Sequence, residues 1–153
     1  MSAQTLERIK RELEDLVTRG REAMGERLQR AREFGDIREN AEYDAAKDAQ
    51  AMMEARIRQL QHMVKYAVVR EIPAQASEAV PGVVVSVRQE GSSETEDYLL
   101  AATTEERVTG AVTISVSSPL GSALLGKQVG DTARVQAPGG IFSVEVISLR
   151  PAE

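Results

Sequence analysis

The chain has no cysteine, no tryptophan, few aromatic residues and no long hydrophobic run. Without cysteine it can form neither a disulfide framework nor a thiolate metal site, which fits a reducing compartment. No apolar stretch approaches the roughly 18 residues of a membrane span, and the N-terminus lacks a signal-peptide core. The net charge of −5 does not favour nonspecific binding to nucleic acid or to a membrane. We therefore expect a soluble cytoplasmic protein without independent DNA binding.

Two long segments carry hydrophobic residues at helical spacing. Residues 5–34 and 41–68 each place an apolar or small residue every three or four positions, with charged residues elsewhere. A helix of 30 residues is about 45 Å long, too long to lie on so small a globule. The pattern predicts an antiparallel coiled-coil hairpin within residues 1–72, rather than two helices of a bundle, because no further long helix follows. The apolar stripe comprises Leu6, Ile9, Leu13, Leu16 or Val17, Gly20, Met24, Leu28 and Ala31, then Ala46, Ala49, Met53, Ile57, Leu60, Val64 and Ala67.

The turn of this hairpin is short and acidic. Gly35 can end the first helix, because the residue just past a helix end often needs a left-handed conformation. Asp36 can cap the second helix, with Glu39 three residues on as in a capping box. Together with Glu42 these residues place three carboxylates within seven positions, which we expect to be exposed. We call residues 35–43 the tip; taken alone, its acids are explained best by helix capping.

The second half of the chain has a different composition. Residues 73–79 read as a linker, and residues 80–153 contain short β-branched runs separated by turn residues. The sequence predicts a small α+β domain with a mostly antiparallel sheet and one short helix near residues 118–126. The expected strands are Val83–Val87, Tyr98–Ala102, Val112–Val116, Thr132–Ala137 and Phe142–Leu149.

The tip sequence GDIRENAEY resembles the signature of the bacterial Gre-type transcript cleavage factors, the GreA/GreB family. The resemblance covers nearly the whole chain and implies a coiled coil that enters the secondary channel of RNA polymerase. It also implies a C-terminal domain, similar in fold to FK506-binding proteins, that docks on the polymerase. Further runs that fit the family are Arg56-Ile57, Ser118-Pro119-Leu120-Gly121, Gly126-Lys127, Gly130-Asp131 and Pro138-Gly139-Gly140.

The resemblance assigns roles to the tip. Asp36 and Glu39 would be the catalytic carboxylates and would complete a second Mg²⁺ site that the polymerase alone holds loosely, since carboxylate oxygens are the ligands magnesium prefers. The factor would thus stimulate cleavage of backtracked RNA without being an enzyme itself, and would hold no tightly bound cofactor when free. Asn40, Glu42 and Tyr43 would support the tip.

Some features have a second explanation. Four basic residues near the tip either guide it to the RNA 3′ end or the polymerase, or are ordinary solvated charges: Arg30, Arg32, Arg38 and Lys47. The Met52-Met53 pair is expected to pack within the hairpin. An inhibitor that occupies the same channel without cleavage is the alternative function. A prolyl isomerase is rejected because the C-terminal half offers too few aromatic residues for a proline pocket. We expect a monomer.

Overall fold

The computed structural model describes residues 1–33 and 37–152, with the side chains of residues 37–40 outside this description. The chain divides into two compact units: Leu6–Ala67, called the hairpin unit here, and Met1–Thr5 together with Val68–Glu153, called the sheet unit. Among the described residues, no helix combines the length and hydropathy needed to cross a membrane. The fold is α+β, as the sequence predicts.

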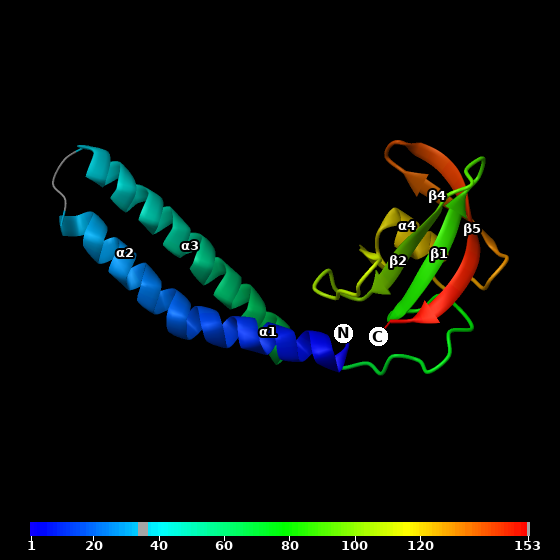
Figure 1. The fold of residues 1–153 in the computed structure, drawn as a ribbon, viewed down its shortest axis with the longest axis horizontal. Coiled ribbons are helices and arrows are strands. Elements are labelled where there is room, and N and C mark those ends of the chain that lie inside the picture. Colours follow the sequence, from blue (N-terminus) through cyan, green and yellow to red (C-terminus); the bar gives the residue numbers. More distant parts are fainter. Residues whose placement is uncertain (34–36, 153) are drawn as a thin grey trace. The chain divides into compact units, whose positions relative to one another are not determined.

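The hairpin unit consists of helices. In Figure 1, α1 and α2 follow one another along one side, and α3 runs beside them in the opposite direction. A π-helical turn, η1, connects α1 to α2 without breaking the helical path. The bounds are α1 Ala3–Asp15, η1 Leu16–Gly20, α2 Arg21–Glu33 and α3 Ile37–Lys65.

The predicted apolar stripe faces the partner helix. Every residue of the stripe is buried or half-buried, and Ile9, Ile57 and Leu60 are the largest fully buried side chains of the unit. This confirms the helical period that the sequence indicates. The prediction for the methionine pair is correct for Met53, which is half-buried, but wrong for Met52, whose side chain is 75% exposed. Met52 lies one position off the stripe, which turns it toward solvent.

Two details of the helices differ from the prediction. The first helix contains η1, where the Thr18 hydroxyl donates to the Glu14 carbonyl at 2.8 Å and so competes with the regular helix ladder. The second helix ends at Lys65 instead of residue 68. The chain beyond it binds the N-terminus: the Met1 ammonium donates to the Val68 carbonyl, and the Arg70 amide donates to the Met1 carbonyl, both at 2.9 Å.

The sheet unit contains five strands in the order β3-β2-β1-β5-β4. Three of the four pairings are antiparallel. The pairing of β2 with β3 is parallel, because residues 102–111 lead the chain from the end of β2 back along the strand, so that β3 begins beside Tyr98. All five predicted strands are present, most of them longer than predicted. The bounds are β1 Val83–Gln89, β2 Thr95–Ala101, β3 Val112–Ser115, β4 Thr132–Ala137 and β5 Gly140–Pro151, with the short helix α4 at Pro119–Leu124.

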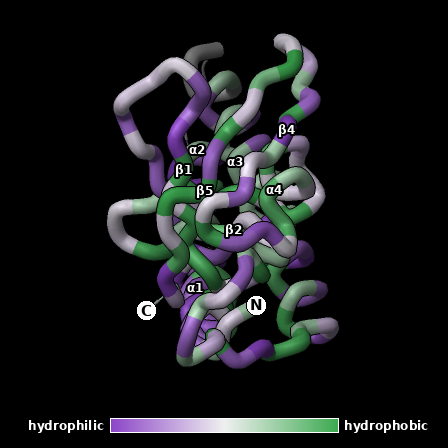
Figure 2. Tube along the Cα trace, turned by 90° about the vertical axis from the view of Figure 1, so that its right-hand side faces the viewer, coloured by the Kyte–Doolittle hydropathy of each residue, from purple (hydrophilic) through white to green (hydrophobic). Residues whose placement is uncertain are grey.

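The central strand β1 is buried on both faces. Val83, Val85 and Val87 belong to the larger core, which also receives Leu124 of α4, whereas Val84 belongs to a second cluster on the opposite face. Figure 2 shows hydrophobic stretches along both β1 and β5. A strand buried on both sides needs a nearly continuous apolar run, and this explains the valine-rich sequence of β1.

Candidate functional site

The predicted tip joins the two helices of the hairpin. Helix α2 ends at Glu33 and α3 begins at Ile37, directly after Asp36. Asp36 itself lies outside the described residues, so both its capping role and its metal role stay predictions. Glu39 and Asn40 belong to the first turn of α3, as does Arg38, and their side chains are not described.

The described part of the tip contains one contact between the helices. Tyr43 is half-buried on α3, and Arg32 lies in the last turn of α2. The Arg32 Nη2 donates to the Tyr43 hydroxyl at 3.4 Å, and its guanidinium carbon lies 5.7 Å from the centre of the ring. The hydrogen bond from Arg32 lowers the pKa of the Tyr43 phenol. Glu42, the neighbouring acid, is exposed.

The basic residues near the tip have different surroundings. Arg30 is exposed, and Lys47 is exposed with its Nζ donating to Gln50 Oε1 at 3.1 Å. Arg32 is exposed but engages Tyr43, as described above. Arg30 and Lys47 are therefore accessible to an anionic partner, while Arg32 already has a contact within the chain.

Two bidentate ion pairs connect the helices farther from the turn. Arg21 donates through Nε and Nη2 to both carboxylate oxygens of Glu54, at 2.9 and 3.0 Å. Arg56 binds Glu12 in the same way, at 2.8 and 3.0 Å. The hydrogen bond to Glu54 raises the pKa of Arg21, and the same bond lowers the pKa of Glu54. Neither pair is predictable from the sequence, because each depends on the register of one helix against the other.

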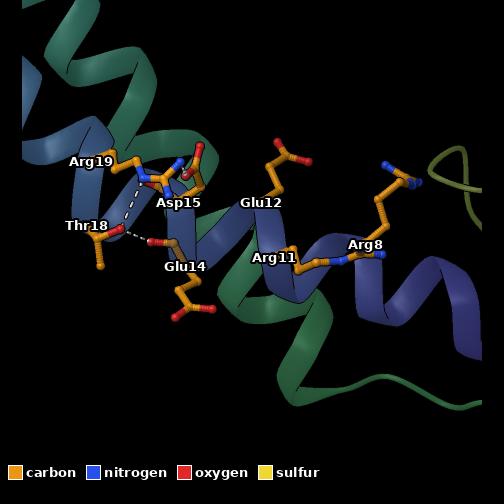
Figure 3. Close-up of a pocket in the computed structure, with 7 residues that line it drawn as sticks. All are labelled: Arg8, Arg11, Glu12, Glu14, Asp15, Thr18 and Arg19. Atoms are coloured by element: carbon orange, nitrogen blue, oxygen red, sulfur yellow. Dashed lines mark hydrogen bonds and ion pairs between the residues drawn. The ribbon is translucent and has the colours of Figure 1, made fainter.

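A charged pocket lies on α1 and η1, between Arg8 and Arg19 (Figure 3). Two of its three acids are paired: Glu12 with Arg56 of α3, and Asp15 with Arg19, whose guanidinium lies 3.3 Å away. Among the described residues, no group of three or more histidine, cysteine or acidic side chains could hold a metal ion. The pocket is therefore best explained as a surface of paired charges rather than as a metal site.

The donor chemistry of the tip fits a partial magnesium site. Asp36 and Glu39 supply hard carboxylate oxygens, which magnesium prefers. Magnesium is usually held by one or two carboxylates while water and phosphate oxygens fill the other positions. Two carboxylates close together in the sequence thus suit an ion that another molecule also binds.

The comparisons with known proteins cover both units. Residues 1–69 match the family model GreA_GreB_N, "Transcription elongation factor, N-terminal", and residues 74–151 match GreA_GreB, "Transcription elongation factor, GreA/GreB, C-term". The transcription elongation factor GreA of Bacillus cytotoxicus is 40% identical over 98% of this chain and 95% of its own length. That of Saccharopolyspora erythraea is 40% identical over 99% and 93%. A crystal structure of the GreA factor homolog 1 (Gfh1) protein of Thermus thermophilus is 29% identical, with a TM-score of 0.43 over 98% of this chain and 97% of that one.

Proposed function

The chain belongs to the GreA/GreB family of transcription elongation factors, and on this premise we propose that its tip helps RNA polymerase to cleave backtracked RNA. The observation that carries the proposal is the position of the tip sequence, between the end of α2 at Glu33 and the start of α3 at Ile37. A sequence that joins two long antiparallel helices lies at the end of the hairpin. We propose that its carboxylates act on a second molecule.

The hairpin is suited to delivering these carboxylates. With 29 residues, α3 is about 43 Å long. Two helices joined by the buried stripe and by the Arg21–Glu54 and Arg56–Glu12 pairs form a narrow, stiff rod. We propose that this rod enters the secondary channel of the polymerase, with the tip at the RNA 3′ end. The partners are thus RNA polymerase and the nascent RNA within its complex.

Asp36 and Glu39 are the proposed catalytic residues. They would hold part of the coordination sphere of a Mg²⁺ ion shared with the polymerase, an ion that when bound stabilises charge on the phosphate and activates water. Their own contribution would be negative charge and acceptor oxygens. In this proposal the polymerase remains the enzyme, and this chain supplies part of its active site.

The sheet unit is the proposed docking part. Several apolar side chains there are exposed, and such residues are available for contact with a partner protein. Docking through the sheet unit would raise the effective concentration of the tip at the channel. The exposed large apolar residues are Val68, Val69, Val112, Leu125, Val129 and Ile141.

The substitution Asp36→Asn tests the metal role against the capping role. Asparagine caps a helix about as well as aspartate, so helix content and melting temperature should be unchanged. A neutral amide is a poorer magnesium ligand. If the carboxylate contributes about 2.8 kcal/mol to the transition state, RNA cleavage in a backtracked elongation complex should fall about 100-fold. Binding, measured by competition with the wild-type protein for polymerase, should persist.

The matched control is Asp48→Asn, which removes one exposed acid from α3. Its cleavage rate should stay within about twofold of the wild type, since surface charges far from the reaction contribute little. Near-normal cleavage by a folded Asp36→Asn protein would contradict the metal role. A wild-type protein that binds the polymerase but leaves the RNA uncut would instead support the inhibitor alternative.

A further inference from the structure

Among the described residues, a polar contact connects the helix ends next to the turn. Among the side chains that the structure describes, the buried ones nearest to the turn are Leu28, Ala31 and Ala46, and each alanine contributes a single methyl group. Since hydrophobic stabilisation scales with the apolar area buried, this layer holds the helices only weakly. Among the described residues, the contact between Arg32 and Tyr43 is the cross-helix interaction nearest to the turn.

This contact lies one helical turn from a proposed catalytic residue. Tyr43 is four residues after Glu39 in α3, and positions four apart lie on the same face of a helix. Fixing the Tyr43 ring against α2 therefore fixes the rotation and tilt of the first turn of α3. Arg32 is on the opposite helix, in its last turn, so the contact spans the two arms of the hairpin.

We propose that Arg32 and Tyr43 form a clamp that positions the acidic tip for RNA cleavage, and that Arg32 is a positioning residue rather than a contact to RNA or polymerase. The inference rests on the proposed function of the tip. The clamp needs an arginine in particular, because a planar guanidinium can lie against an aromatic ring while an N–H donates to its hydroxyl. The compact ammonium of a lysine does not reproduce both interactions.

The clamp has a spectroscopic signature that is independent of activity. The chain has three tyrosines and no tryptophan, so phenolate absorbance reports only Tyr43, Tyr66 and Tyr98. The hydrogen bond from Arg32 lowers the pKa of Tyr43, burial opposes it by raising this pKa, and Lys47 lowers and Asp44 raises it by smaller amounts. Burial and the hydrogen bond to Glu96 raise the pKa of Tyr98 to about 12. The titration step that is missing in Tyr43→Phe identifies the Tyr43 phenolate.

The experiment compares full-length variants in a backtracked elongation complex, measuring the maximal cleavage rate and the half-saturating protein concentration. Arg32→Gln and Tyr43→Ala should each lower the maximal rate about two- to fivefold, the factor that corresponds to an exposed cation–π contact, at unchanged half-saturating concentration. The double variant should be no worse than either single one, because both changes break the same contact. Arg32→Lys should not restore the rate. Arg27→Gln, which removes an exposed arginine from the same helix, is the matched control and should behave as the wild type.

The titration should agree with the kinetics. In Arg32→Gln the Tyr43 phenolate step should move to higher pH, and in Arg27→Gln it should stay in place. An unchanged step in Arg32→Gln would show that the contact does not form in solution and would overturn the clamp. The clamp would also be overturned if the decreases in maximal rate of Arg32→Gln and Tyr43→Ala multiplied in the double variant and Arg32→Gln raised the half-saturating concentration. That result would favour direct binding of Arg32 to RNA or polymerase.

The two proposals fail in different ways. If the wild-type protein does not stimulate cleavage, the proposed function is wrong, and Arg32 then has no cleavage to position even where the titration shows the contact. If the wild type stimulates cleavage and Arg32→Gln keeps its full maximal rate, only the clamp is overturned. Tyr43→Phe guards against loss of folding, because it removes the hydroxyl and keeps the ring, and its rate should lie between those of the wild type and Tyr43→Ala.

Discussion

The substitution Gly121→Ala should destabilise the sheet unit. Gly121 lies in α4 and approaches the end of β3 so closely that an added Cβ would overlap the Ser115 carbonyl oxygen. The Ser115 carbonyl carbon would lie only 2.9 Å from it, and Ser118 Oγ 3.0 Å. These neighbours cannot move aside cheaply: the carbonyl is part of the backbone, and Ser118 Oγ is fixed because it donates to Ser115 O and accepts from the Gly121 amide.

The size of the effect follows from two opposing contributions. Overpacking against fixed atoms costs up to about 3 kcal/mol, and occasionally more. Alanine gains about 1 kcal/mol over glycine in a helix. The net loss is about 2 kcal/mol, which for a unit of this size lowers the melting temperature by about 8 to 16 °C.

Thermal unfolding can be followed separately in the two units. The hairpin unit dominates the far-ultraviolet helix signal, whereas Tyr98 is the only tyrosine of the sheet unit and gives its near-ultraviolet signal. We expect Gly121→Ala to shift the Tyr98 transition alone. The control Ser122→Ala removes an exposed hydroxyl from the same helix and should change the free energy of unfolding of the sheet unit by no more than about 0.5 kcal/mol. If the Tyr98 transition of Gly121→Ala had the same melting temperature as that of Ser122→Ala, the close approach of α4 to β3 would be refuted.

Three further predictions concern the hairpin unit and its tip. Gly25→Ala should stabilise the helix signal by up to about 1 kcal/mol in urea unfolding, because no atom lies within 4 Å of the added Cβ; Gly20→Ala should gain less, since its Cβ would meet Met53 Sδ at 3.3 Å. The hydrogen bond from Arg21 lowers the pKa of Glu54 in the folded state below its unfolded value of about 4.5. The stability that the ionised Glu54 contributes is therefore present above this unfolded value and is lost as the pH falls through the folded pKa. The melting temperature of the helix signal should decline more steeply between pH 6 and 3 in the wild type than in Glu54→Gln. The free protein should bind Mg²⁺ only weakly, because two or three carboxylates cannot fill six coordination positions, and micromolar binding in calorimetry would contradict the shared site.

The sequence predicts the elements of the fold well because each has a strong local signal. The apolar stripe of the hairpin is buried or half-buried at every position, and residues 118–126 form the expected short helix with Ser118 as its N-cap. The parallel pairing of β2 with β3 is not predictable in this way, since it depends on where residues 102–111 lead the chain. The π-turn at Leu16–Gly20 is another exception, because no hydrophobic period marks the insertion of one residue.

The candidate site also contains features that the local sequence predicts and one contact that it does not predict. The acids of the tip are visible in the sequence because they are adjacent, and the family comparison gives them a chemical context. The Arg32–Tyr43 contact joins residues 11 positions apart on two helices, and it depends on both the length of the turn and the register of the stripe. From the sequence, Arg32 is therefore either a guide to the RNA or the polymerase or an ordinary solvated charge, and only the register gives it a partner within the chain.

The acids of the tip and the arginines of the hairpin have different requirements. A carboxylate that acts on a shared metal ion must stay free of cations within its own chain, because a paired acid is a weaker ligand. A positioning residue has the opposite requirement and is useful only when it is engaged. The hairpin places Arg32, Arg21 and Arg56 in contacts with Tyr43, Glu54 and Glu12, in each case across the two helices. Arginines engaged in this way connect the two helices and stiffen the rod.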